Sequence, residues 1–241
     1  MIYFISDVHL GFYEKELDLP RELIFLRFLD TIKKDAERIF LVGDIFDYWF
    51  DYKTVIPKQF FRVLNKLWEL RQSGIKIDYI IGNHDFGHLS FFEEELDIPL
   101  YKGDISCEIK DKKFYISHGD GKNLKDKGYL LLKKITRNPL ILKLYLMLHP
   151  NFGIWLASGS SKKSRSYTDN REHLEDEPMK EFAYRMIDDG YDFVIMGHRH
   201  KSEFTKYKDS YYINLGEWFK EPMFAQFDGI NMSLRKVSEL V

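Results

Sequence analysis

Five short motifs bring together side chains that could bind metal ions or move protons, and they contain five of the eight histidines. The motifs are Asp7-Val8-His9, Gly43 to Asp47, Gly82 to Asp85, His118 to Asp120 and Gly197 to His200. Carboxylates packed together without a cation would have raised pKa values and would cost folding free energy. Imidazole, carboxylate and amide oxygen together suit Mn, Fe, Zn or Co better than Ca. The motifs therefore predict a centre for two divalent metal ions.

The spacing within the motifs indicates what such a centre would do. Residues i and i+2 leaving a strand point the same way, so Asp7 and His9 are expected to hold one ion. His198 and His200 repeat this spacing, although their two imidazoles could reach different ions. The two oxygens of Asp44 can bridge a pair of ions, an arrangement used for in-line displacement at phosphorus. We therefore expect phosphate-ester chemistry.

Each motif follows a short apolar run that is typical of a buried strand. The runs span residues 2–6, 38–42, 76–81, 114–117 and 192–196. Amphipathic helical patterns at residues 23–32 and 60–68 separate the first three runs. This alternation predicts an α/β fold with right-handed parallel crossovers. Ligands bind at the carboxyl ends of strands in such sheets, so the five motifs are expected to converge in one crevice.

The C-terminal third has a different pattern, with strand-like runs at residues 202–207, 211–215, 223–227 and 232–236 separated by short turns. These runs predict an antiparallel end to a mixed sheet or a second sheet. The 241 residues are 44% hydrophobic, which is enough for one domain over residues 1–241. Because Cys107 is the sole cysteine and the first residues lack a charged leader, we expect a cytoplasmic protein.

Residues 121–168 form an insert of unusual charge, with ten basic residues and one acidic residue. The insert carries a net charge of +9, so the rest of the chain carries -11 against a total of -2. Two apolar helical patterns, divided by Asn138 and Pro139, are both shorter than the ~20 apolar residues of a membrane span. They predict a helical lid or an interfacial helix pair. The alternative is that their apolar faces close a core or a dimer contact while the lysines are solvated.

The order of the motifs, DxH, GDxxD, GNHD, H and GHxH from Asp7 to His200, resembles the calcineurin-like metallophosphoesterase superfamily. The resemblance implies a four-layer α/β/β/α sandwich. It implies that one metal is held by Asp7, His9, Asp44 and His200, and the other by Asp44, Asn83, His118 and His198. His84 would be a catalytic residue that is not a ligand, stabilising charge on the phosphoryl group or protonating the leaving group. Asp47 would orient His84.

A closer resemblance is carried by DVHLG, GDIFDYW, GNHDF and SHGD, and by Arg137, Asn138 and Pro139 followed by Ser161 and Lys162. These residues resemble the UDP-2,3-diacylglucosamine pyrophosphatases of lipid A synthesis, a subfamily of peripheral membrane enzymes. The resemblance implies Mn as the metal, UMP and 2,3-diacylglucosamine 1-phosphate as products, and an insert that covers acyl chains. It implies substrate contacts by Arg137, Ser161, Lys162 and Arg165. Enzymes of the subfamily carry Arg at the position of His84 and Asn at that of Arg165.

Charge also bears on the expected partners. The overall charge of -2 gives no electrostatic reason to expect nucleic acid, and no protein partner is inferred. The resemblance implies a UDP-linked diacyl sugar as substrate and a peripheral location on the inner face of the inner membrane. The insert agrees with this, because its apolar helices suit acyl chains and its positive charge suits phosphates and an anionic membrane surface. The alternative is a related metallophosphoesterase acting on another nucleotide or phosphodiester substrate. A nuclease and a non-catalytic scaffold of the same fold are further alternatives.

Overall fold

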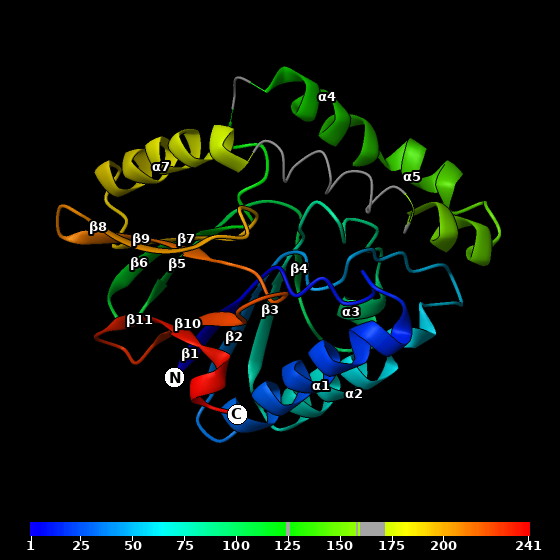
Figure 1. Ribbon diagram of the computed structural model, residues 1–241, viewed down its shortest axis with the longest axis horizontal. Helices are drawn as coiled ribbons and strands as arrows, with labels where there is room; N and C mark the ends of the chain where they lie inside the picture. The colour runs from blue at the N-terminus through cyan, green and yellow to red at the C-terminus, as the bar shows by residue number, and fades with distance from the viewer. Residues whose placement is uncertain (124–125, 158, 160–171) are drawn as a thin grey trace.

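The computed structural model describes residues 1–123, 126–157, 159 and 172–241. Two β-sheets lie face to face, and helices cover the outer face of each sheet (Figure 1). Helices α1 (Lys15–Ile32) and α2 (Phe61–Gln72) lie on one side, and helix α7 (Glu172–Asp188) lies on the other. This arrangement has the four layers of an α/β/β/α sandwich, which confirms the predicted fold class.

The first sheet has six strands in the order β11-β10-β1-β2-β3-β4. Their bounds are β1 Ile2–Ile5, β2 Arg38–Val42, β3 Lys76–Ile80, β4 Leu100–Tyr101, β10 Met223–Phe227 and β11 Met232–Lys236. Strands β1 to β4 are parallel, whereas β10 and β11 add an antiparallel hairpin beside β1. Because β1, β2 and β3 are parallel neighbours, the three motifs that follow them leave the sheet at the same edge.

The second sheet has five strands in the order β5-β6-β7-β9-β8. Their bounds are β5 Ile105–Ile109, β6 Lys112–Ser117, β7 Phe193–Met196, β8 Ser202–Tyr207 and β9 Ser210–Leu215. Strands β6, β7 and β9 are parallel, and antiparallel β5 and β8 form the two edges. The C-terminal third therefore contributes to both sheets, since β8 and β9 belong to the second and β10 and β11 extend the first.

Aromatic side chains fill the space between the two sheets. Phe4 of β1 stacks on Phe40 of β2, with ring centroids 5.1 Å apart, and on Phe114 of β6, at 5.8 Å. All three side chains are fully buried. Offset stacking of this kind adds to the large apolar area that aromatic residues bury. The packing holds β1 and β2 against β6, so the two sheets are fixed face to face.

Shorter helices complete the chain, and those of the insert lie at one edge of the sandwich (Figure 1). Helix α3 spans Phe91–Glu94, and 3-10 turns span Lys58–Phe60 and Val237–Glu239. In the insert, α4 spans Lys127–Thr136, α5 spans Pro139–Tyr145, and residues 150–157 are helical. The Asn138 side chain caps α5 by accepting a hydrogen bond from the Leu140 backbone N–H at 2.9 Å. None of the helices in the described part of the chain has the length and apolar character needed to cross a bilayer.

Candidate metal centre

The loops that follow β1, β2, β3, β6 and β7 meet at one edge of the two sheets. Within the first sheet, the Asp7 backbone N–H donates to Gly43 O at 3.1 Å. Two further bonds join the sheets, because the His198 backbone N–H donates to Asp7 Oδ2 at 2.9 Å and His118 Nδ1 bonds to Val42 O at 2.9 Å. The five motifs predicted to converge are therefore in contact.

Most of the predicted ligands have a left-handed backbone. The φ angles are +52° at Asp7, +50° at His9, +54° at Asp44, +71° at His198 and +55° at His200. Such angles cost of the order of 1 kcal/mol or more in a non-glycine residue and cluster at functional sites. Strand β1 ends at Ile5, so Asp7 and His9 lie in the loop beyond it. Asp7 and His9 lie close together, as predicted. The predicted reason, alternation along an extended strand, is wrong, because the left-handed backbone of the loop after β1 brings them together.

The first predicted ligand set, Asp7, His9, Asp44 and His200, is assembled in this loop region. His9 Nε2 lies 3.7 Å from both Asp7 Oδ1 and Asp44 Oδ2. His200 Nε2 lies 3.4 Å from Asp7 Oδ1 and 3.2 Å from His9 Nε2. Ligand atoms that share one ion at roughly 2.1 Å stand about 3 to 3.5 Å apart, so this spacing suits a common ion.

The second predicted set, Asp44, Asn83, His118 and His198, lies directly beside the first. His118 Nε2 lies 3.3 Å from Asp44 Oδ2 and 3.0 Å from Asn83 Oδ1. The His198 and His118 ring centroids are 5.3 Å apart. Asp44 Oδ2 thus faces imidazoles of both sets, which is where a bridging carboxylate is needed. The bond from His118 Nδ1 to Val42 O leaves Nε2 directed at the cluster, as in metal-binding histidines.

The two buried carboxylates of the cluster stay ionised. Burial raises the pKa of Asp7, but the surrounding imidazoles, with His200 and His9 foremost, together hold it well below its usual range. Burial likewise raises the pKa of Asp44, and the surrounding imidazoles, led by that of His118, together bring it below its usual range. Asp44 in turn raises the pKa of His118 to about 10, against the effect of burial. The carboxylates therefore draw positive charge into the site, as protons or as metal ions.

A second observation shows that a cation fits this donor set. Asp7 Oδ1 is buried and receives no hydrogen bond of good geometry from the described residues. A buried carboxylate oxygen left in this way costs free energy unless another group satisfies it. Among the described residues, three groups of carboxylate and imidazole atoms are close enough to hold an ion, and each contains Asp7 or Asp44. The imidazoles in these groups are those of His9, His84, His118 and His200. The residues present therefore fit divalent ions.

Glycines in the motifs make room for the ligand side chains. A Cβ atom at Gly82 would overlap the Asp44 carboxylate and lie 2.5 Å from its backbone nitrogen. A Cβ atom at Gly43 would lie 2.5 Å from His118 Nδ1, and one at Gly197 would overlap Asp7. These positions are tighter than real Cβ contacts allow, so glycine is required beside three of the predicted ligands.

His84 and Asp47, predicted to be catalytic, lie at the rim of the cluster. His84 Nδ1 is 3.6 Å from Asp47 Oδ1, and the same oxygen is 3.3 Å from His9 Nδ1. The His84 backbone N–H donates to Asp44 Oδ1 at 2.8 Å, which fixes the loop independently of the imidazole. Its side chain retains some exposure, at 12%, whereas Asp47 is buried. His84 therefore combines a fixed backbone with a side chain that packs against the His9 ring and is only partly exposed.

Asp85 has a role that the motif alone did not indicate. Its carboxylate accepts hydrogen bonds from the Gly82 N–H at 2.8 Å, the Ile45 N–H at 3.0 Å and the Tyr79 hydroxyl. Burial, together with the charge of Asp44, raises the pKa of Asp85 to about 6. Asp85 thus joins the loops after β2 and β3. The sequence around Asp85 gives no signal that its carboxylate bonds to the backbone of Ile45, 40 residues earlier.

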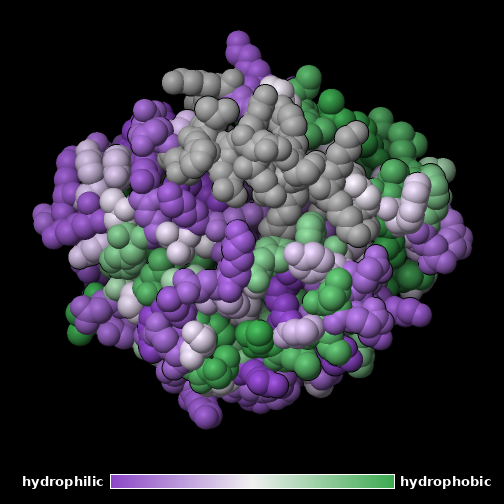
Figure 2. All heavy atoms as spheres, viewed as in Figure 1, coloured by the Kyte–Doolittle hydropathy of each residue, from purple (hydrophilic) through white to green (hydrophobic). Residues whose placement is uncertain are grey.

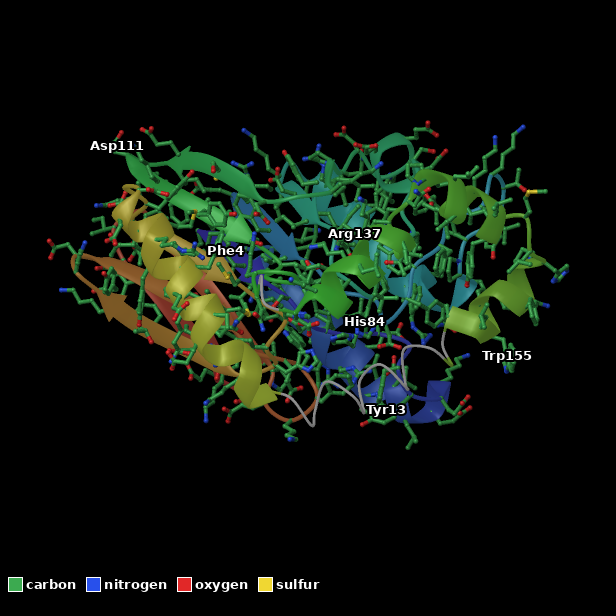
Figure 3. All side chains as sticks on the ribbon, turned by 90° about the horizontal axis from the view of Figure 1, so that it is seen from above. Phe4, Tyr13, His84, Asp111, Arg137 and Trp155 are labelled. Atoms are coloured by element: carbon green, nitrogen blue, oxygen red, sulfur yellow. The ribbon has the colours of Figure 1, made fainter. Side chains whose placement is uncertain are left out.

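The predicted substrate contacts divide into two groups. Arg137 lies beside the cluster, because its Nη2 donates to Gly82 O at 2.9 Å and to Asp120 Oδ2 at 3.0 Å. Figure 3 shows Arg137 and His84 near each other in the middle of the molecule. Ser161, Lys162 and Arg165 lie outside the described residues. Burial raises the pKa of Asp120, but Arg137 leads the groups that hold it at about 2.

A cavity of about 410 Å³ connects the cluster with the insert. Its lining includes Asp47, Asn83 and His84 from the motif loops, polar residues of α4, and apolar side chains of α5 such as Leu142. A cavity of this size accommodates part of a large ligand. The mixture of polar and apolar lining suits a molecule that has a polar and an apolar part.

We expect Gly82→Ala to displace Asp44 and lower the metal content of the protein. A shift of about 1 Å at a reacting centre can reduce turnover roughly 100-fold, so hydrolysis of bis(p-nitrophenyl) phosphate should fall as well. Metal per chain is measured by mass spectrometry after loading with Mn. The matched control is Gly103→Ala, whose Cβ would meet no atom within 4 Å. Equal metal content and turnover in the two variants would contradict this role of Gly82.

Comparison with known proteins gives a consistent result. Residues 1–202 match the model of the family described as calcineurin-like phosphoesterase. The chain is 32% identical to a UDP-2,3-diacylglucosamine hydrolase of Porphyromonas gingivalis, covering 99% of this chain and 98% of the relative. It is 27% identical to a protein of the same name from Yersinia pseudotuberculosis, covering 96% of each.

Among solved structures, Yfce, a phosphoesterase from E. coli, superposes with a TM-score of 0.50 at 12% identity, covering 100% of this chain and 94% of that one. This likeness supports the fold alone. The family model spans all five motifs, and its metal-dependent chemistry agrees with the buried carboxylate and imidazole cluster. The chain belongs to the calcineurin-like phosphoesterase family of metal-dependent hydrolases.

Proposed function

We propose that this phosphoesterase hydrolyses the pyrophosphate bond of UDP-2,3-diacylglucosamine, giving UMP and 2,3-diacylglucosamine 1-phosphate. The observation that carries the proposal is the cavity that is lined both by Asn83 and His84 and by apolar residues of α5. An enzyme that acts only on soluble nucleotides would have no use for the apolar part of the cavity lining. Two relatives with the corresponding name, similar over nearly their full lengths, support the same substrate.

In this proposal the two predicted ligand sets hold two divalent ions, with Mn favoured by the resemblance to the pyrophosphatases. Asp7, His9, Asp44 and His200 form one set, and Asp44, Asn83, His118 and His198 form the other. When bound, divalent ions offset the negative charge that develops on a phosphoryl group during displacement. The side chains themselves orient the site, since hydrogen bonds to the backbone hold Asp7, Asp44 and His118 in place.

His84 acts on the phosphoryl group or the leaving oxygen, and Asp47 orients it. The separation of 3.6 Å between His84 Nδ1 and Asp47 Oδ1 is long for a hydrogen bond, but catalytic contacts are often loose before substrate binds. With Nδ1 turned towards Asp47, Nε2 is the nitrogen left to donate a proton. His84 also lines the cavity, where it would meet the substrate.

His84→Ala should reduce kcat by about 100-fold, within the range of general acid catalysis, while two metal ions per chain remain bound. Metal binding is retained because the backbone N–H of residue 84, and not the imidazole, bonds to Asp44. Steady-state kinetics and metal analysis on the same preparation test this. Asp47→Asn provides a milder comparison, with a smaller fall in kcat. Loss of a metal ion in His84→Ala would make His84 a ligand and contradict the assignment.

The proposal includes a lid formed by the insert, residues 121–168, over the cavity. Its described helices contribute to the cavity walls, with Leu132 and Lys133 from α4 and Ile141 and Leu142 from α5. The apolar wall beyond the polar residues suits acyl chains, which are transferred from water at about 0.8 kcal/mol per buried CH₂ group. The sugar would then lie between the metal centre and the lid, with its chains directed towards α5.

Turnover of the diacylated UDP-sugar should exceed that of its deacylated analogue by at least about 100-fold in kcat/KM, because only the first can fill the apolar end of the cavity. Rates are measured by release of UMP. Hydrolysis of bis(p-nitrophenyl) phosphate by the same preparation controls for the state of the metal centre. Equal rates for the two sugars would eliminate the lipid substrate and favour a phosphodiesterase of soluble nucleotides.

The outer surface of the insert supports a peripheral position on an anionic membrane. Large apolar side chains on it are exposed, among them Leu140, Leu144, Met147 and Trp155 at 57–76%. Figure 2 shows hydrophobic atoms gathered at the edge where α4 and α5 lie, and Figure 3 places Trp155 at the periphery. Lysines interspersed with such residues are typical of interfacial helices that bind acidic lipid.

The protein should co-sediment with vesicles that contain phosphatidylglycerol and be released by high salt, because added ions screen attraction between exposed charges. Trp155→Ser should weaken the binding, since it removes an exposed aromatic side chain from the apolar surface. Phe61→Ser is the matched control, because Phe61 is equally exposed, at 67%, but belongs to α2 and not to the insert. Binding that is absent, or unaffected by both salt and Trp155→Ser, would contradict the membrane proposal.

A further inference from the structure

Asp120 receives three donors on one carboxylate oxygen. Lys133 Nζ lies 2.7 Å from Asp120 Oδ2, Arg137 Nη2 lies 3.0 Å away, and the Tyr129 hydroxyl lies 3.2 Å away. Lys133 Nζ also donates to the Asp120 backbone carbonyl at 2.8 Å. Asp120 itself is buried, with 6% of its surface exposed. Charge-assisted hydrogen bonds in such a setting are stronger than neutral ones.

All three donors belong to a single face of the α4 region. Tyr129, Lys133 and Arg137 are spaced at i, i+4 and i+8, which places them in one row along a helix. Leu131 and Ile135 of the same helix are exposed, at 60% and 44%. Asp120 is therefore the group that selects which face of α4 turns towards the metal centre.

The same face reaches the loop that carries Asn83 and His84. Arg137 Nη2 bonds to Gly82 O as well as to Asp120, so one guanidinium nitrogen joins the loops after β3 and β6. Tyr129, Lys133 and Arg137 also line the 410 Å³ cavity next to Asn83 and His84. Two cations face one carboxylate here, which leaves an excess of positive charge at the cavity wall.

Asp120 does not serve the neighbouring metal-ligand histidine directly. The His118 ring is oriented through Nδ1 by Val42 O, and its Nε2 faces Asn83 Oδ1. The carboxylate of Asp120 instead contacts side chains of α4. Because Asp120 follows β6, these contacts attach α4 of the insert to the second sheet beside the candidate metal centre.

We propose that Asp120 is a positioning residue that holds Lys133 and Arg137 at the cavity wall, where they bind the phosphate of a sugar 1-phosphate unit of the substrate. This inference rests on the proposed function in that it assigns the phosphate to the sugar. Asp120 acts through the two cations and does not itself touch the substrate. Its removal should weaken binding of the phosphate and leave the metal-centred chemistry unchanged.

The test uses Asp120→Asn in the full-length, Mn-loaded enzyme. We expect KM for the diacylated UDP-sugar, and the inhibition constant of glucosamine 1-phosphate against bis(p-nitrophenyl) phosphate hydrolysis, each to rise by about tenfold or more. The kcat values for both substrates and the metal content should change by less than about threefold, a split that general loss of structure would not produce. Thermal unfolding establishes that the variant is folded. If Asp120→Asn does not fold, Asp120→Glu is used, with the same split expected.

Asp126→Ala is the matched control. The Asp126 side chain caps α4 by accepting a hydrogen bond from the Tyr129 N–H at 2.9 Å, so its loss weakens the helix without removing the Asp120 contacts. If Asp126→Ala produces the same rise in the inhibition constant, Asp120 only stabilises the position of α4, and the proposal is overturned. A fall in kcat for the aryl diester in the Asp120 variant would also overturn it.

A double-mutant cycle with Arg137→Gln tests the route of the effect. If Asp120 acts through Arg137, the double variant should lose much less affinity for glucosamine 1-phosphate than the sum of the single losses. Additive losses would contradict the proposal. The inhibition constants do not require the lipid substrate, so a wild-type enzyme that fails to hydrolyse the UDP-sugar refutes the proposed function while the constants still decide the role of Asp120.

Discussion

The burial of two ionised carboxylates, Asp7 and Asp44, is the constraint around which the rest of the structure is arranged. Protonation of either carboxylate is unfavourable, because nearby imidazoles stabilise the ionised forms. Both side chains are buried, so bulk water cannot solvate their charges. Each accepts a backbone N–H from another motif, His198 for Asp7 and His84 for Asp44. The sandwich of two sheets provides the rigid frame that holds these loops in contact against their own repulsion and strain.

Local sequence patterns were sufficient for most of the frame. All nine predicted strands are present. Five of them are apolar runs that end at a polar motif, and the four C-terminal ones are strand-like runs separated by turns. The C-terminal third adds antiparallel strands to the first sheet and also contributes to the second sheet, so both predicted alternatives are found. The sequence analysis missed β4, which has only two residues, β5, whose burial alternates weakly, and α7. A run of several strand-forming residues can be recognised from the sequence. A two-residue strand such as β4 forms only because a neighbouring strand of the sheet is there to pair with it.

The sequence indicated which residues come together at the candidate site, but not how the backbone brings them together. Five of the seven predicted ligands supply closely spaced ligand atoms, and Asn83 and the His198 ring lie next to His118. Loops with left-handed residues bring them together, and not extended strand ends. Asp85 and Asp120 belong to the same motifs, but their partners lie on distant segments such as Ile45 and Lys133. Side-chain types can indicate what a cluster binds, whereas hydrogen bonds between loops far apart in sequence become apparent only in the folded chain.

The backbone bonds among the motif loops have a consequence for how this protein can change over evolutionary time. A hydrogen bond that ends on a main-chain carbonyl, such as that from His118 Nδ1 to Val42 O, does not depend on the side chain of the residue that carries the carbonyl. Substitution at such a residue can therefore leave the contact between the loops intact. Relatives share only 27–32% of their residues with this chain over nearly their whole length, and contacts of this kind would tolerate much of that difference.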